Sequence, residues 1–88
     1  MGTGEAMTPQ NPKAYEMLRA LVNSGNPVVA SEAKLALAGA DIINPGGFME
    51  AVLRGDATDA YWRADGENLA ILIDNGFAVK GGRHPVWE

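Results

Sequence analysis

Residues 65–76, DGENLAILIDNG, decide whether the C-terminal third of this chain is helical or forms a sheet. The stretch has the parts of a complete helix: Asp65 at the N-cap, an apolar stripe, and Gly76 where the left-handed residue after a helix is needed. The stripe consists of Leu69, Leu72 and Ile73. Phe77 follows where an apolar residue commonly packs back onto the helix that has just ended. This pattern predicts a helix at about 66–75.

The same stretch also fits a sheet, because Asp-Gly, Asn-Gly and Gly-Gly divide residues 61–88 into four segments. These dipeptides are the favoured residues of two-residue hairpin turns. Leu69, Ile71 and Ile73 alternate as they would in a strand, and the β-branched Ile suits a strand better than a helix. The alternative fold is therefore α+β, with three helices followed by a four-stranded antiparallel meander.

The upstream sequence favours the helix, because the Asn-Pro pairs at 11–12, 26–27 and 44–45 each precede an apolar periodic segment. Asn is a strong N-cap residue, and Pro is favoured at the first helical position. Gly closes each segment, as in LVNSG, LALAG and VLRG. The sequence therefore predicts helices at about 12–24, 27–38 and 45–54, followed by a short segment capped by Asp56.

Together these signals predict a mainly α fold, a small bundle of four to five short helices with a C-terminal β-hairpin at 77–87. Gly81-Gly82 is the expected turn of the hairpin, and Pro85 confines its second strand to an edge. Residues 1–10 lack periodicity and are expected to form a disordered leader, which leaves 11–88 as a single helical domain.

The composition is globular but poor in large side chains. Of the 88 residues, 47% are hydrophobic and 20% are charged, yet only 7% are aromatic. Small side chains bury little apolar area each, so we expect a partner or a second copy to cover part of the surface. There is no cysteine, and no apolar run approaches the roughly 20 residues that cross a bilayer. The expected location is the cytoplasm, without a membrane partner.

The chain lacks a set of residues that could perform a common reaction. His84 is the sole histidine and, without Cys, it cannot anchor a typical zinc site. The carboxylates fall at predicted helix starts, where capping and the helix dipole already account for them. The sequence therefore predicts a protein that is not an enzyme and that needs no cofactor or metal.

A basic cluster in the predicted hairpin raises nucleic-acid binding as the alternative function. Three helices followed by a hairpin is the order of a winged helix, and LIDNGFAVK (72–80) resembles the step from recognition helix to wing in such domains. Lys80, Arg83 and His84 would be the candidate nucleic-acid contacts. However, the helix expected at 66–75 carries acidic residues and no Lys or Arg, and the net charge is −4, both of which disfavour a phosphate backbone.

Protein–protein interaction or self-association is the favoured function, through an Ala-rich apolar helical surface. In the predicted helix 27–38, Val29, Ala33, Ala36 and Leu37 form one stripe, and Val28 and Leu35 lie outside it. A helix that is apolar on two sides is either central in a monomer or covered by a partner. Tyr61, Trp62 and Arg63 are a second candidate contact site, because these residue types are enriched at binding hot spots. The competing interpretation places Trp62 in the core and Tyr61 at its rim.

Overall fold

Two of the three Asn-Pro pairs begin helices. In the computed structural model, which describes residues 6–77, Asn11 caps α1 (Pro12–Leu21) and Asn26 caps α2 (Pro27–Leu37). The Asn11 side chain accepts a hydrogen bond from the Ala14 amide at 3.0 Å, and Asn26 accepts one from the Val28 amide at 3.0 Å. α1 ends three residues before the expected position 24, because its last turn tightens into hydrogen bonds from Asn23 and Ser24 to carbonyls three residues back.

The third Asn-Pro pair does not begin a helix, which corrects the expected start at 45. Asn44 adopts the left-handed conformation with φ of 50°, whereas an N-cap residue is normally extended. The chain therefore turns before Pro45, and α3 (Gly47–Arg54) begins two residues later. Its N-cap is Gly46, which contributes no side-chain hydrogen bond.

The stretch that decides the fold is helical. α4 (Ala57–Arg63) is capped by Asp56, and α5 (Gly66–Asp74) is capped by Asp65. Gly76 ends α5 with φ of +83°, and the buried Phe77 donates its amide to the Leu72 carbonyl at 2.8 Å. The four-stranded meander is therefore wrong, because its second strand is α5. Except for Phe77, the expected hairpin at 77–87 lies outside the described residues.

Residues 6–10 are part of the fold, unlike the leader expected over 1–10. β1 (Ala6–Met7) pairs antiparallel with β2 (Ile42–Ile43), with Ala6 opposite Ile43. Gln10 then donates its amide to the Leu53 carbonyl at 2.9 Å. This approach leads the chain directly into the start of α1.

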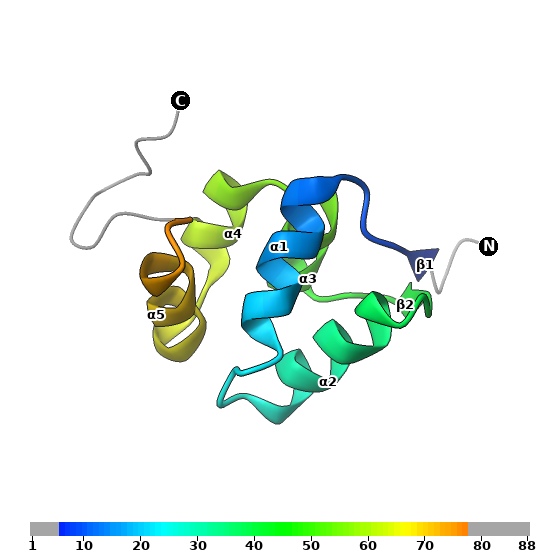
Figure 1. Cartoon of the computed structure of the whole chain (residues 1–88), viewed down its shortest axis with the longest axis horizontal. Coiled ribbons are helices and arrows are strands. Elements are labelled where there is room, and N and C mark those ends of the chain that lie inside the picture. Colours follow the sequence, from blue (N-terminus) through cyan, green and yellow to red (C-terminus); the bar gives the residue numbers. More distant parts are fainter. Residues whose placement is uncertain (1–5, 78–88) are drawn as a thin grey trace.

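α1 is the central helix of the described residues. It packs against α2, α3 and α5, and Figure 1 shows it between α2 on one side and α4 and α5 on the other. The largest fully buried side chains are Met17, Leu18, Leu21, Val52, Leu53 and Leu72. Alanines fill much of the remaining core: Ala14, Ala33, Ala36, Ala51, Ala57 and Ala60. The role of central helix therefore falls to α1, and α2 covers one side of it.

Asn11 and Gly55 lock the start of α1 to the end of α3. Gly55 ends α3 in the left-handed conformation with φ of +74°, and the Asn11 side chain lies directly over its Cα. Asn11 donates its Nδ2 to the Arg54 carbonyl at 2.9 Å while its Oδ1 caps α1. One side chain thus satisfies groups at the ends of two helices.

Asn68 joins α5 to the turn between α1 and α2. It is the single buried polar residue of the described chain, at 2% exposure. Its Oδ1 accepts a hydrogen bond from the Ser24 hydroxyl at 2.7 Å, and its Nδ2 donates to Asp65 at 3.0 Å. The Ser24 oxygen in turn accepts the Asn26 amide at 3.0 Å. Both polar groups of the Asn68 side chain therefore have a partner, as low-dielectric burial requires.

Candidate interaction surface

α2 presents an apolar stripe to solvent. Val28 is 63% exposed and Leu35 is 50% exposed, although both are large aliphatic side chains. Ser31 and Ala38 are also exposed, and the spacing of three and four residues places all four on one side of the helix. We call Val28, Ser31, Leu35 and Ala38 the outer α2 face. The opposite side of α2 is buried against the core through Val29, Ala33 and Ala36.

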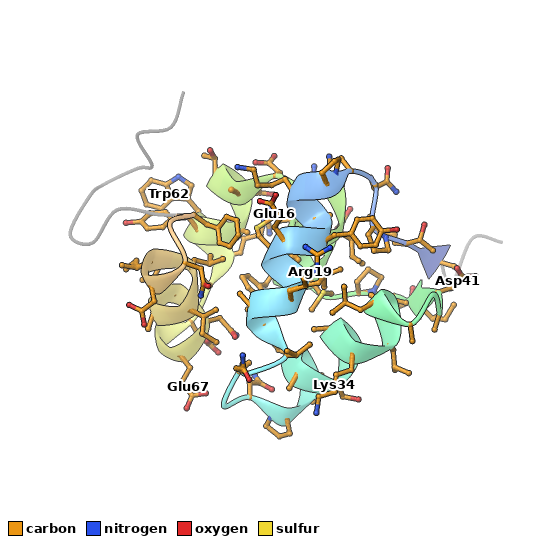
Figure 2. All side chains as sticks on the ribbon, in the orientation of Figure 1. Glu16, Arg19, Lys34, Asp41, Trp62 and Glu67 are labelled. Atoms are coloured by element: carbon orange, nitrogen blue, oxygen red, sulfur yellow. The ribbon has the colours of Figure 1, made fainter. Side chains whose placement is uncertain are left out.

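Two opposite charges border this face. At roughly 100° per residue, Glu32 and Lys34 lie on opposite sides of the line that joins Val28 to Leu35. Figure 2 shows Lys34 on the side of α2 turned away from α1. Neither charge takes part in the ion pairs found within residues 6–77, which join Asp59 to Arg54 and to Arg63. Desolvation by partial burial raises the pKa of the Glu32 carboxyl above its ordinary value of 4.5.

Glu32→Gln is expected to raise the free energy of unfolding at neutral pH, because desolvation of the Glu32 carboxylate disfavours the charged form. A raised pKa means that the folded protein holds a proton that the unfolded chain has lost, so the parent gains stability as pH falls through that pKa. The advantage of Glu32→Gln should therefore be present at pH 7 and vanish below about 4.5. Urea unfolding of both proteins from pH 7 to pH 4 measures this difference. An advantage that grows on acidification would contradict the assignment.

Trp62 is the exposed member of the aromatic pair, which reverses the expected placement of Trp62 in the core. Trp62 is 57% exposed, whereas Tyr61 is half-buried and packs against the core. The two rings meet edge to face, with centroids 5.1 Å apart and planes at 81°. Of these two expected contact residues, Trp62 is thus the one that offers a large apolar area to a partner.

The Arg63 side chain makes its polar contacts with residues of the same chain. Its Nε donates to Asp59 at 2.9 Å, and Arg54 binds the other oxygen of the same carboxylate at 2.7 Å. The Arg63 guanidinium also lies over Gly47 at the start of α3. Since its side chain is still half exposed, Arg63 can border a contact site, but it first stabilises the packing of α4 on α3.

The expected partner-binding residues lie in two separate places. Val28 and Leu35 belong to α2, and Tyr61, Trp62 and Arg63 belong to α4. In Figure 2, Trp62 on α4 lies at the upper left and Lys34 on α2 lies at the bottom, on separate parts of the molecule. A single small partner surface would therefore meet one group or the other. The outer α2 face is the larger of the two regular surfaces, because it extends over more than two helical turns.

A hollow beside α1 was not indicated by the sequence. It has a volume of about 460 Å³ and is lined by Pro9, Gln10, Asn11, Pro12, Tyr15, Glu16 and Arg19. Figure 2 shows Glu16 and Arg19 on the solvent side of α1. Pro9 and Gln10 line part of the hollow, and both fall within the segment that the sequence predicted to be a disordered leader. Tyr15 was the available signal, as a large ring at a position outside the buried stripe of α1.

Nucleic-acid contacts gain no support from the described residues. Lys80, Arg83 and His84 lie outside them. α5, the helix that would enter a groove, carries Glu67 and Asp74 and no Lys or Arg. Within residues 6–77, acidic and histidine side chains form no cluster of three that could hold a metal ion, and no helix there is both long and apolar enough to span a membrane.

Asp56 and Asp65 behave as expected for capping residues. Asp56 accepts the Asp59 amide at 3.0 Å, and Asp65 accepts the Asn68 amide at 3.2 Å. Their carboxylates are thereby used at helix starts.

Comparison with known protein families, characterised proteins and solved structures finds no match to this chain.

Proposed function

We propose that this chain is a small, non-enzymatic interaction module that binds another protein or a second copy of itself through the outer α2 face. The observation that carries the proposal is the exposure of Val28 and Leu35, at 63% and 50%, on a helix whose other side is already buried. Exposed apolar residues are common singly, but a regular stripe along one helix face is the pattern of a helix-in-groove or helix-pair contact.

Three further features support this choice of surface. The helix is rigidly held, since Asn26 caps its start and Gly39 ends it with φ of +97°. Ser31 and Ala38 are small, so another backbone can approach between Val28 and Leu35 and again just beyond Leu35. The face itself carries no charged side chain that association would have to desolvate, because Glu32 and Lys34 stand at its borders.

A photo-crosslinking residue at position 35 should form covalent adducts with the partner in the native host. Adduct yield at position 35 should exceed that at position 43 severalfold, because only position 35 lies within reach of a partner bound to the outer α2 face. Ile43 is the matched control, because it is 56% exposed and lies outside α2. Mass spectrometry of the adducts identifies the partner as this chain or another protein.

A second substitution separates binding from mere exposure. Val28→Glu, combined with the crosslinker at position 35, should abolish the adduct, because it places a charge in the contact while leaving the buried side of α2 intact. Circular dichroism checks that the variant keeps its helices. Equal yields at positions 35 and 43, or an adduct that survives Val28→Glu in a folded protein, would remove the support for this surface.

A further inference from the structure

We propose that the occupant of the outer α2 face is a second copy of this chain, with the two α2 helices side by side and parallel around a two-fold axis. This inference rests on the proposed function and specifies its partner. The features that point to it are the heptad spacing of the face and the placement of Glu32 and Lys34 on its two borders.

The spacing of the face matches the seam of a two-stranded helix pair. Val28 and Leu35 are seven residues apart, and Ser31 and Ala38 follow each of them by three. These are the positions a and d of a heptad, which face the partner in coiled-coil packing. In a parallel pair, Val28 meets Val28 of the other copy and Leu35 meets Leu35, with Ser31 between these two layers and Ala38 after the second.

The border charges make the face complementary to itself in the parallel orientation. Within one helix Glu32 and Lys34 do not face each other, because residues two apart point in different directions. A two-fold axis along the helices brings the Glu32 border of one copy against the Lys34 border of the other, and does so twice. Glu32 and Lys34 have no ion pair within the described residues, and in this arrangement each of them gains an oppositely charged neighbour from the other copy.

The antiparallel orientation loses this match. A two-fold axis perpendicular to the helices places each border against the same border of the second copy. With Val28 opposite Leu35 of the other copy, the two Glu32 residues lie near the two-fold axis. Measured along the helix direction, they are about one helical rise apart. Like charges at that separation repel, and Glu32 already lies in partly desolvated surroundings. The charge pattern therefore selects the parallel pair.

The area of the face sets the strength of the pair. α2 has 11 residues, so it is roughly 16 Å long. A stable dimer buries about 800 Å² on each partner, which is more than one helix of this length offers. The pair should therefore be weak, with a dissociation constant on the order of hundreds of micromolar. Tethering or high local concentration would populate it.

Cysteine crosslinking tests the orientation directly, because the chain has no cysteine of its own. Val28→Cys should form a disulfide-linked dimer under mild oxidation at least about tenfold faster than Ile43→Cys, the comparably exposed control. Leu35→Cys should behave like Val28→Cys. An equimolar mixture of the two variants should give mostly the two homodimers, because residue 28 does not face residue 35 in a parallel pair.

Charge reversal gives a second, independent measurement by sedimentation equilibrium at up to about 1 mM, a range suited to so weak a pair. Glu32→Lys and Lys34→Glu should each weaken the dimer by about threefold to fivefold, and the double variant should recover the parent affinity. Weakening in the single variants followed by recovery in the double variant is specific to a parallel pair, because in an antiparallel pair each border meets itself and stays like-charged in the parent and in every variant. Thermal melts confirm that each variant is folded.

The outcomes distinguish this inference from the function on which it rests. Predominant 28–35 disulfides in the mixture would overturn the parallel orientation and leave self-association in place. Disulfide rates equal to that of Ile43→Cys, with a monomer at 1 mM, would overturn the second copy as occupant. In that case, a position-35 adduct with a different protein would still uphold the proposed function, and the lack of any adduct would remove both.

Discussion

Gly55→Ala is expected to lower the free energy of unfolding by about 3 kcal/mol, which corresponds to a fall in melting temperature of about 15 °C for a domain of this size. Part of the loss is backbone strain, because Gly55 has φ of +74°, which an L side chain adopts at a cost of about 1 kcal/mol. The rest comes from Asn11, whose side chain occupies the place of the new methyl group. Its displacement removes the cap of α1 and the hydrogen bond to Arg54, worth about 1 kcal/mol each.

Gly39→Ala separates the two contributions. Gly39 also ends a helix with positive φ, of +97°, but a methyl group there meets no atom within 4 Å. It should therefore show the strain alone, about 1 kcal/mol. Chemical denaturation of both variants measures the difference. Equal losses at the two glycines would show that Asn11 moves aside freely and that the junction of α1 with α3 contributes little.

Asn68→Ala is expected to destabilise the fold by about 2–3 kcal/mol. The substitution removes two hydrogen bonds from a side chain that is 2% exposed, and it leaves the Ser24 hydroxyl without its acceptor. It also opens a small cavity between α5 and the turn after α1. Because Asn68 belongs to α5 and joins it to Ser24, hydrogen exchange of the α5 amides should accelerate more than that of α1.

Asn75→Ala is the matched control for Asn68→Ala, since it removes an asparagine from the end of the same helix. Asn75 is exposed and its side chain donates to the Ile71 carbonyl at 2.9 Å, so its loss should cost under about 0.5 kcal/mol. A double-mutant cycle with Ser24→Ala measures the contact itself. A coupling energy near zero between Ser24 and Asn68 would contradict the role given to this hydrogen bond.

The start of a helix was predictable from sequence wherever a residue with a capping side chain also adopted the backbone conformation of an N-cap. Asn11, Asn26, Asp56 and Asp65 all act as the expected caps. The predicted helix start at Asn44-Pro45 was wrong for a physical reason. Apart from Gly, Asn is among the residues that best tolerate the left-handed conformation, and Asn44 adopts it. The pairing of β1 with β2 was not predictable, since strands of two residues carry no periodicity.

The candidate surface was predictable in part. The sequence placed Val28 and Leu35 outside the predicted buried stripe of the helix, and both side chains are exposed in the structure. The exchanged roles of Tyr61 and Trp62 also had a signal in the sequence. Ala57, Ala60, Tyr61 and Ala64 lie at i, i+3, i+4 and i+7, which is the buried stripe of a helix and places Trp62 outside it. The ion pairs of Arg63 depend on how α4 packs on α3, which local patterns do not specify.

The alanines of the core govern how this protein responds to temperature. Unfolding exposes little apolar surface for each residue, and newly hydrated apolar surface is what raises the heat capacity of the unfolded state. Because Ala14, Ala33, Ala51 and Ala60 occupy much of the interior, we expect a small heat-capacity change on unfolding. The free energy of unfolding should then vary gently with temperature, so that cooling weakens the fold little.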